Sequence, residues 1–347
     1  MALRQATPLP KKNKKMSPRS TRDRVTKAVP SGTTGFLLVD KAKGPTSHDV
    51  VQAVRALSGQ RRCGHTGTLD PFATGLLPLC LGRATRLAQF VSGTAKTYSA
   101  IMRFGYATDT YDATGRLVGP KVEVNLIPEV LERWLSGFIG SQEQVPPTFA
   151  AKKIKGQRMY RLARAGIHVE PRPVRVFIHR IDLQEVQGDR AMLVVEVGAG
   201  TYIRSLAHDL GRRLGCGAHL EELRRIHVGP FSLEQALSLE KLETLALEGR
   251  LQEAIWEPAR ALSNLPALQL GTDGASRVSH GMVVSPLHIV GQVPDVPPGQ
   301  PCRLLGPGGE LLAVGVAAKD LSQFRPTVVL ASPPPVDTRQ GGSGKAF

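Results

Sequence analysis

Apolar residues recur along the first half of the chain in spacings that predict alternating strands and helices. An unbroken apolar run over residues 35–41 predicts a buried strand, and residues 96–104 predict another. Between these two strands a helix is predicted, with Ser47 as its N-cap and Gly59 as its stop. Its buried face would consist of four apolar residues at helical spacing: Val50, Val51, Val54 and Leu57.

The same patterns continue to the end of the chain. Helices are predicted over residues 85–91, 128–138, 200–214 and 218–225, and strands over 173–186 and 191–197. The glycine-rich stretch from Cys63 to Gly75 is predicted to be a loop. Beyond residue 264 short apolar runs are separated by Gly and Pro, which predicts a small β module with strands at 281–284, 302–305, 311–316 and 327–330.

Charge is concentrated in two segments. The 347 residues include 45 Lys and Arg against 29 Asp and Glu, a net charge of +16. Residues 1–30 carry nine cations and one anion, and residues 146–175 carry eight cations and one anion, so the rest of the chain is nearly neutral. We expect residues 1–32 to be a disordered basic tail, with an organelle transit peptide as the alternative. Such an excess favours a polyanionic partner, and nucleic acid ahead of a membrane.

Several classes of protein are excluded by simple patterns. No apolar run reaches the ~18 residues of a membrane span, and the N-terminus has no apolar core of a secretory signal. The four cysteines are scattered without a Cys-x-x-Cys pair, which argues against a disulfide framework or a zinc knuckle. We therefore expect a cytoplasmic protein that needs neither a metal nor a cofactor.

Two glycine-containing loops suggest a nucleotide-binding site and a calcium site, but neither has the residues that such a site needs. Gly64-His-Thr-Gly67 runs into Leu69-Asp70 rather than the Gly-Lys-Ser/Thr end of a nucleotide-binding loop. Taken alone, His65 and Asp70 fit a turn better than a metal site or a hydrolytic triad. A calcium loop starting at Asp109 would place Pro120 where a bidentate Glu is needed.

Tyrosines lie next to cations at three places, although aromatic residues make up only 5% of the chain. Tyr98, Tyr160 and Tyr202 could stack on unstacked bases while the neighbouring cations bind phosphates, or they could be half-buried sheet residues. A carboxylate in a glycine-flanked loop, an arginine to pair with it, a stacking tyrosine and a basic insert together suit chemistry on an RNA nucleotide.

The longest of these motifs resembles the catalytic motif of the TruB family of bacterial tRNA pseudouridine synthases. It is Gly64-His-Thr-Gly-Thr-Leu-Asp-Pro-Phe-Ala-Thr-Gly-Leu-Leu-Pro-Leu-Cys-Leu-Gly-Arg-Ala-Thr-Arg86. Four further blocks agree in order and spacing: residues 35–41, Lys96-Thr-Tyr98, Thr108-Asp-Thr110 with Asp112, and Gly200-Thr-Tyr-Ile-Arg204 continuing to Arg225. The similarity covers about residues 35–232, and the C-terminal module is weakly similar to the family's PUA-like domain.

The resemblance implies a role for each matching residue. Asp70 would be the catalytic aspartate, Arg204 its salt-bridge partner and Tyr98 the residue that stacks on the target base. Arg204 would keep Asp70 charged by lowering its pKa. The other implied residues bind RNA or support the site: His65, Lys41, Asp109, Tyr202, Leu223, Lys152, Lys153 and Arg158. Two departures stand out, because the family commonly has Ser-Ala-x-Lys where this chain has Ala150-Ala-Lys-Lys153, and often a lysine where it has Gly198-Ala199.

The resemblance also implies fold, function and organisation. The fold would be α+β, a pseudouridine-synthase fold with a central mixed or antiparallel β-sheet flanked by helices, plus a small PUA-like β domain. The domains would be a basic tail at 1–32, a catalytic domain at 33–263 with an RNA-clamping insertion at 146–175, a PUA-like domain at 264–332 and a disordered tail at 333–347. A cytoplasmic monomer would isomerise uridine 55 in the T-arm of tRNA without an obligate protein partner.

Two alternatives remain open. A guide-RNA-dependent, dyskerin-like synthase of the same superfamily would need protein partners and a fuller PUA domain. A non-catalytic tRNA-folding or ribosome-associated RNA-binding protein would share the basic charge and the tyrosines, but would leave Asp70 and Arg204 without a task.

Overall fold

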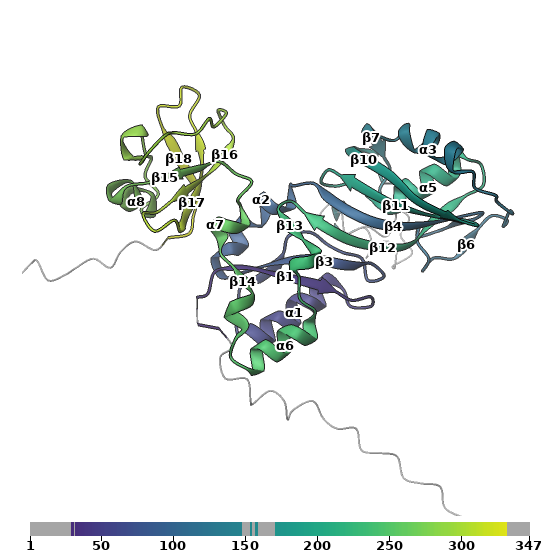
Figure 1. Cartoon of the computed structure of the whole chain (residues 1–347), viewed down its shortest axis with the longest axis horizontal. Helices are drawn as coiled ribbons and strands as arrows, with labels where there is room; N and C mark the ends of the chain where they lie inside the picture. Colours follow the sequence, from purple (N-terminus) through teal and green to yellow (C-terminus); the bar gives the residue numbers. More distant parts are fainter. Residues whose placement is uncertain (1–28, 31, 148–152, 155–156, 159–170, 332–347) are drawn as a thin grey trace, which may run out of the picture.

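The computed structural model describes residues 29–30, 32–147, 153–154, 157–158 and 171–331, and most of them surround one large mixed β-sheet (Figure 1). Among the described strands of this sheet, β3 and β12 form the one parallel pair, and all other neighbours are antiparallel. The order of strands is β14 (Ile255–Trp256), β1 (Gly35–Lys41), β3 (Thr74–Leu81), β12 (Ala218–Val228), β4 (Lys96–Phe104), β11 (Arg190–Val197), β10 (Val174–Gln187) and β7 (Gly140–Gln144). The predicted α+β fold with a central mixed sheet is confirmed.

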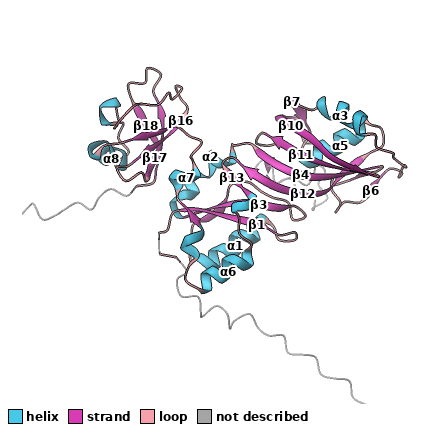
Figure 2. Cartoon of the chain, viewed as in Figure 1, coloured by secondary structure: helices cyan, strands magenta, loops and turns pink. Residues whose placement is uncertain are grey.

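Two pairs of helices cover different halves of the sheet (Figure 2). Helices α1 (Ser47–Ser58) and α6 (Leu239–Leu247) pack on each other and cover the half that contains β1 and β3. Helix α5 (Ile203–Arg213) packs on β12 and β4, and α3 (Pro128–Ser136) packs on β10. Short elements complete the domain: β2 (Cys63–His65), a 3₁₀ turn (Gly82–Leu87), α2 (Ala88–Ser92), β5 (Ala107–Thr108), β6 (Leu117–Val118), β13 (Phe231–Ser232) and α7 (Pro258–Ala261).

Helix α1 forms where the apolar spacing predicts it, but its cap lies one residue earlier. Thr46 is the N-cap, and its hydroxyl accepts a hydrogen bond from Asp49 N while the Asp49 carboxylate accepts one from Thr46 N. Gly59 ends the helix in the left-handed conformation, with φ of 67°. Ser47, the predicted N-cap, instead makes hydrogen bonds through its hydroxyl to the backbone of Leu69.

The helix predicted over residues 218–225 is wrong, because this segment is the central strand β12. Its Leu, Glu and Arg residues favour a helix locally, but pairing with β4 over nine positions determines the structure. The predicted loop from Cys63 to Gly75 also contains more structure than expected, since β2 begins it and β3 starts at Thr74. The helix predicted at 85–91 is shorter, starting as the 3₁₀ turn and becoming α2 at Ala88.

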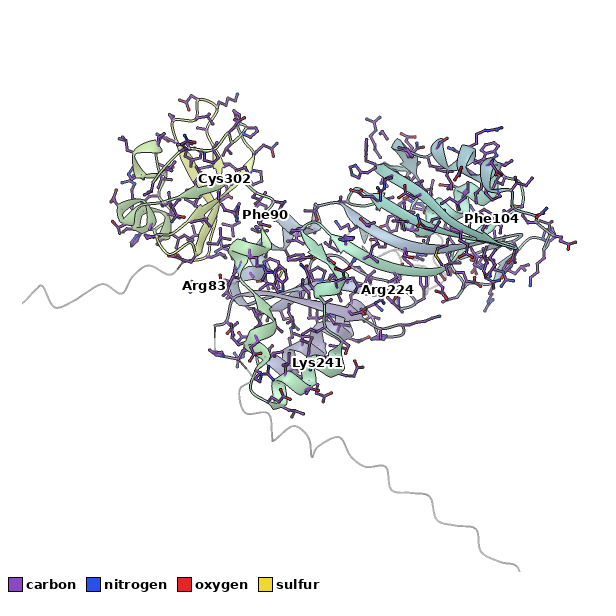
Figure 3. All side chains as sticks on the ribbon, in the orientation of Figure 1. Arg83, Phe90, Phe104, Arg224, Lys241 and Cys302 are labelled. Carbon is purple, nitrogen blue, oxygen red and sulfur yellow. The ribbon has the colours of Figure 1, made fainter. Side chains whose placement is uncertain are left out.

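The C-terminal residues form a separate sheet with the order β15 (Ala267–Gln269), β16 (Pro301–Leu305), β17 (Leu311–Ala317) and β18 (Phe324–Val329). The strand predicted at 281–284 is wrong: the helix α8 (Thr272–Ser279) precedes it, and Val284 makes a single bridge to Phe324. The side chains of Arg83 and Arg86 join this sheet to the main domain by donating to the carbonyls of Leu330 and Val329, both at 2.6 Å. Figure 3 shows Arg83 between the two sheets.

Much of the predicted basic insertion lies outside the described residues. Within it the short strands β8 (Lys153–Ile154) and β9 (Gln157–Arg158) pair with each other. Lys152 and Tyr160 lie outside the described residues, as do the whole predicted tail at 333–347 and the predicted tail at 1–32 apart from residues 29, 30 and 32.

All four cysteines are free thiols. No helix in the described ranges is long and apolar enough to cross a membrane. Within the same ranges, no three His, Cys, Asp or Glu side chains gather where they could hold a metal ion.

Candidate active site

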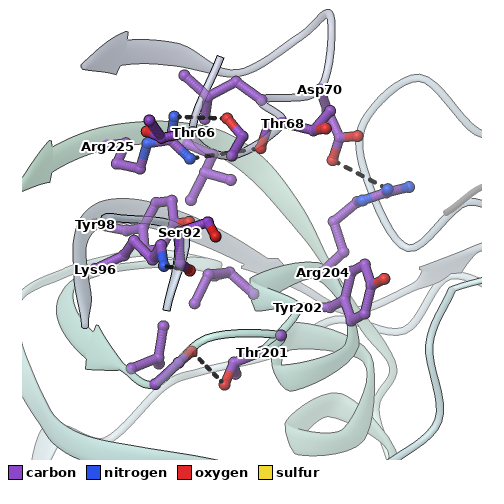
Figure 4. A pocket seen from close by; sticks show the side chains of 17 residues that line it. Thr66, Thr68, Asp70, Ser92, Lys96, Tyr98, Thr201, Tyr202, Arg204 and Arg225 are labelled. Atoms are coloured by element: carbon purple, nitrogen blue, oxygen red, sulfur yellow. Dashed lines mark hydrogen bonds and ion pairs between the residues drawn. The ribbon is translucent and has the colours of Figure 1, made fainter. Parts of the chain in front are cut away.

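Five of the predicted residues line one pocket, of about 260 Å³, on the main sheet (Figure 4). They come from elements far apart in the sequence: the β2–β3 loop, β4, the N-terminal end of α5, and β12. These residues are Asp70, Tyr98, Tyr202, Arg204 and Leu223. The structure therefore brings together the predicted carboxylate, its arginine and the predicted base-stacking tyrosine.

Arg204 lies between two carboxylates. Its Nη2 is 3.0 Å from Asp70 Oδ2, and its Nη1 is 3.2 Å from Asp112 Oδ2. Only 5% of the Arg204 side chain and 4% of the Asp112 side chain are exposed, whereas 33% of the Asp70 side chain is. Asp112 is thus the buried partner of the Arg204 guanidinium, and Asp70 is the partner whose carboxylate is exposed to the pocket.

Asp112 is itself fixed by its own loop. Its Oδ1 accepts hydrogen bonds from the backbone N–H and the hydroxyl of Thr114, and from the hydroxyl of Thr110 at 2.9 Å. These three donors fix the orientation of the Asp112 carboxylate toward Arg204. The neighbouring Asp109, which the resemblance implies as a supporting residue, is more exposed and accepts a hydrogen bond from Arg116 N at 2.8 Å.

The pKa of Asp70 is shifted upward, not downward as the sequence led us to expect. One face of the carboxyl meets the cavity, but the protein around the rest of it withdraws water from the charge and raises its pKa. Arg204 and Lys41 oppose this rise, while the negative charge of Asp112 adds to it. The effect of burial therefore outweighs the attraction of Arg204 and Lys41.

Three side chains hold the backbone of the loop that carries Asp70. Ser47 Oγ accepts from Leu69 N at 2.8 Å and donates to Leu69 O at 3.0 Å, immediately before Asp70. Lys41 Nζ donates to Pro71 O at 3.4 Å, immediately after Asp70, and to the carbonyls of two other residues. Each neighbour of Asp70 is therefore tied to a buried side chain.

Arg225 is the third of these side chains and is 1% exposed. Its guanidinium donates to the carbonyls of Gly67, Thr68 and Leu76 at 3.1, 3.4 and 2.7 Å, on both sides of the Asp70 loop. The parallel pairing of β3 and β12 brings it there, since Arg225 lies opposite Gly75. A Cβ at Gly75 would lie 2.4 Å from Arg225 O, so only glycine permits this approach.

The N-terminal end of α5 is held by a side chain from another strand. Tyr202 precedes this helix and makes no side-chain cap to it. Instead the Gln144 amide accepts from Tyr202 N at 2.8 Å and donates to Tyr202 O at 3.0 Å. The helix that carries Arg204 is thereby fixed to the edge strand β7.

The opposite wall of the pocket contains a buried lysine beside Tyr98. Tyr98 is 9% exposed on β4. The ammonium of Lys96 donates to the carbonyls of Ser92 and Thr94, both at 2.6 Å. Burial, with the nearby charge of Arg225, lowers the pKa of Lys96 to about 8, and burial lowers the pKa of Lys41 to about 8 as well.

The remaining predicted residues are not among those that line the pocket. His65 ends β2, one residue before the lining begins at Thr66, and Asp109 lies in the β5–β6 turn. Lys41 lies behind the Asp70 loop. Lys153 and Arg158 lie in β8 and β9, for which the structure describes the backbone only.

Sequence reasoning missed several residues that shape the site. They are Ser47, Lys96, Asp112, Gln144 and Arg225. Lys96, Asp112 and Arg225 lie within the motif blocks, so the blocks signalled that they matter without showing how. Ser47 and Gln144 act on backbone groups of distant residues, and no local pattern identifies such contacts.

Known proteins resemble this chain in sequence and in structure. The N-terminal domain of TruB family pseudouridylate synthases matches residues 55–203, and the tRNA pseudouridylate synthase B C-terminal domain matches residues 204–263. The tRNA pseudouridine synthase B of Solibacter usitatus is 43% identical, over 85% of this chain and 99% of its own length. That of Symbiobacterium thermophilum is 46% identical, over 73% and 83%.

The similar solved structures include chains from two larger complexes. A Cbf5–Nop10–Gar1 complex contains a chain that is 27% identical with a TM-score of 0.70, over 86% of this chain and 85% of that one. An H/ACA RNP bound to a substrate RNA containing 2′-deoxyuridine gives 26% identity and a TM-score of 0.68, over 87% and 86%. The sequence identity and the matched domains together show that the chain belongs to the TruB family of pseudouridylate synthases.

Proposed function

We propose that this chain is a tRNA pseudouridine synthase that isomerises uridine 55 in the T-arm of tRNA, with Asp70 as its catalytic residue. The observation that carries this proposal is the position of Asp70, whose carboxylate faces the pocket and pairs with Arg204, while Asp112 holds the other side of the Arg204 guanidinium. The 43% identity to a relative matched over 99% of its length supports the substrate.

The reaction is an isomerisation in which atoms balance within the substrate. The N1–C1′ bond of uridine breaks, the uracil turns, and a C5–C1′ bond forms while the C5 proton is lost and N1 gains one. The ionised Asp70 would act at the ribose as nucleophile or base. Arg204 and Lys41 favour the ionised form, and the hydrogen bonds of Ser47 and Lys41 to the adjacent residues fix its direction.

A pocket of this size accepts one nucleoside taken out of its stack. Extruding a base costs a few kcal/mol, which a stacking surface offsets by about 1–3 kcal/mol. Tyr98 and Leu223 would supply that surface, and Tyr202 would close the side next to Arg204. Lys96, in the same wall, would favour a nearby negative charge such as a phosphate or a uracil oxygen.

The rest of the tRNA would be bound outside the pocket. Residues 146–175 have a net charge of +7 and would clamp the T-arm, with Lys152, Lys153 and Arg158 contacting phosphates. His65, at the end of β2 beside the pocket, would contact the T-loop. We further propose that the C-terminal sheet is a PUA-like domain spanning 264–332, and that the protein acts as a monomer in the cytoplasm.

The proposal is tested by incubating the purified chain with unmodified tRNA and detecting pseudouridine by mass spectrometry. We expect conversion at position 55, loss of conversion in Asp70→Asn, and unchanged tRNA affinity in that variant. Asp189→Asn, the same change in a surface hairpin, is the matched control. Retained turnover in Asp70→Asn would contradict the role of Asp70.

The likeness to chains of an H/ACA RNP and of a Cbf5–Nop10–Gar1 complex is the observation that favours the second candidate, a guide-dependent synthase that works with partner proteins. These chains are 26–27% identical to this one, whereas the bacterial tRNA enzymes reach 43–46%. Modification of an isolated T-arm by the chain alone would exclude guide dependence. If a guide RNA and partner proteins were required, the tRNA-specific proposal would be wrong.

A further inference from the structure

A residue next to the active-site ion pairs has an unusual backbone conformation. Tyr111 has φ of 63°, and Leu321 is the one other described non-glycine residue with a positive φ. Bulky L-residues rarely adopt this region, because the side chain crowds the backbone. Such strain persists only where surrounding contacts impose it, and it is concentrated at functional sites.

This conformation determines how the loop meets Arg204. The residues on either side of Tyr111 both accept from Arg204 Nη1: the Thr110 carbonyl at 3.2 Å and the Asp112 carboxylate at 3.2 Å. Tyr111 is thus the pivot between two acceptors of one donor. Rotation of its backbone toward a relaxed conformation would turn one acceptor away from the guanidinium.

The ring of Tyr111 is held by His208, which is one helical turn beyond Arg204. Residues four apart lie on the same face of a helix, so α5 directs both side chains at the same loop. The two rings stack with centroids 3.8 Å apart and an interplanar angle of 15°. Through Arg204 and His208, α5 therefore contacts three consecutive residues, 110 to 112.

Other features of His208 indicate that it acts mainly through the face of its ring, which stacks on Tyr111. Its Nδ1 is buried and has no hydrogen-bond partner among the described residues. Burial lowers the pKa of His208, which favours the neutral ring. Tyr111 is further fixed through its backbone, since Tyr111 O accepts from Leu220 N on β12 at 3.0 Å. Neither ring lines the pocket.

We infer that Tyr111 and His208 are positioning residues for the isomerisation: their stack holds the strained turn that aims Asp112 at Arg204, and Arg204 in turn orients Asp70. This inference rests on the proposed function. It predicts that loss of the stack slows the chemical step without weakening the binding of RNA.

The test measures single-turnover pseudouridine formation on a T-arm RNA at saturating enzyme, together with the Kd for that RNA. We expect His208→Ala to slow the reaction about tenfold, or ~1.4 kcal/mol, with Kd unchanged. His208→Phe keeps a flat ring and loses no hydrogen bond at Nδ1, so it should restore the rate to within about twofold. Each variant is assayed below its measured unfolding midpoint.

A double-mutant cycle separates positioning from a general structural role. If the stack acts through Asp112, His208→Ala should cause no further loss in an Asp112→Asn background. An unchanged rate in His208→Ala, an equal loss in both backgrounds, or failure of His208→Phe to restore the rate would overturn the inference. A wild-type chain that forms no pseudouridine would instead contradict the proposed function, and the inference with it.

Discussion

Ser47 provides a sharp test of whether fixing the Asp70 loop matters for catalysis. Its hydroxyl is buried and makes two hydrogen bonds to the backbone of Leu69, the residue before Asp70. Ser47→Ala removes both bonds and adds no new group. Ser58→Ala is the matched control, because Ser58 is a buried serine at the other end of the same helix, bonded to Val54 O and Gln60 N.

The expected magnitudes follow from these contacts. A buried polar group left without a partner costs about 1–3 kcal/mol, so both substitutions should lower the free energy of unfolding by amounts in that range. Only Ser47→Ala also frees the loop at Asp70. Since a misplacement of ~1 Å can cost about a hundredfold in rate, we expect its kcat to fall between about ten- and a hundredfold.

The assay compares kcat, KM and the unfolding midpoint of both variants with those of the wild type. Ser58→Ala should keep its kcat despite a similar loss of stability, and KM for tRNA should change little in either variant. A kcat that falls equally in both variants would refute the positioning role of Ser47, and so would a kcat that is unchanged in Ser47→Ala.

The other predictions concern charge. The folded state raises the pKa of Asp70, so stability is lost as pH rises from the ordinary aspartate pKa to the raised pKa of the folded state. Asp70→Asn should therefore unfold at a higher temperature than the wild type at pH 7. A lower unfolding midpoint in that variant would contradict the shift. With Lys41 and Lys96 at a pKa of about 8, activity should decline above pH 8, and a flat profile to pH 10 would contradict their charged roles. Alanine at Lys152, Lys153 and Arg158 should reduce the salt dependence of tRNA binding by about one unit of slope per lost phosphate contact, as measured by titrations at several salt concentrations. Deleting residues 1–30 should weaken binding at low salt and leave the modified position unchanged by mass spectrometry.

The local pattern of apolar and polar residues predicted most of the helices and strands. It failed where hydrogen bonding to strands distant in the sequence decides the structure. Residues 35–41 and 96–104 are apolar or alternating stretches whose burial is evident from the sequence, and both are strands. Residues 218–225 have the composition of a helix, but they fill the space between β3 and β4, and their hydrogen bonds go to those strands. The missed β12 is also the strand that delivers Arg225 to the Asp70 loop.

In the candidate active site, the residue types could likewise be predicted from the sequence, but the effects of their three-dimensional arrangement could not. Asp70, Arg204 and Tyr98 were predictable because their residue types bear the chemistry and their motifs resemble a family. The direction of the Asp70 pKa shift was not predictable, since it depends first on how much protein surrounds the carboxyl and then on the charges of Arg204 and Asp112 beside it. Pairing one arginine with two aspartates leaves a net negative charge, so the arrangement keeps Asp70 less stabilised than a simple ion pair would. Under the proposed function, the nearby charge of Asp112 would make the Asp70 carboxylate more basic, so Asp112 would tune the reactivity of Asp70 as well as hold Arg204.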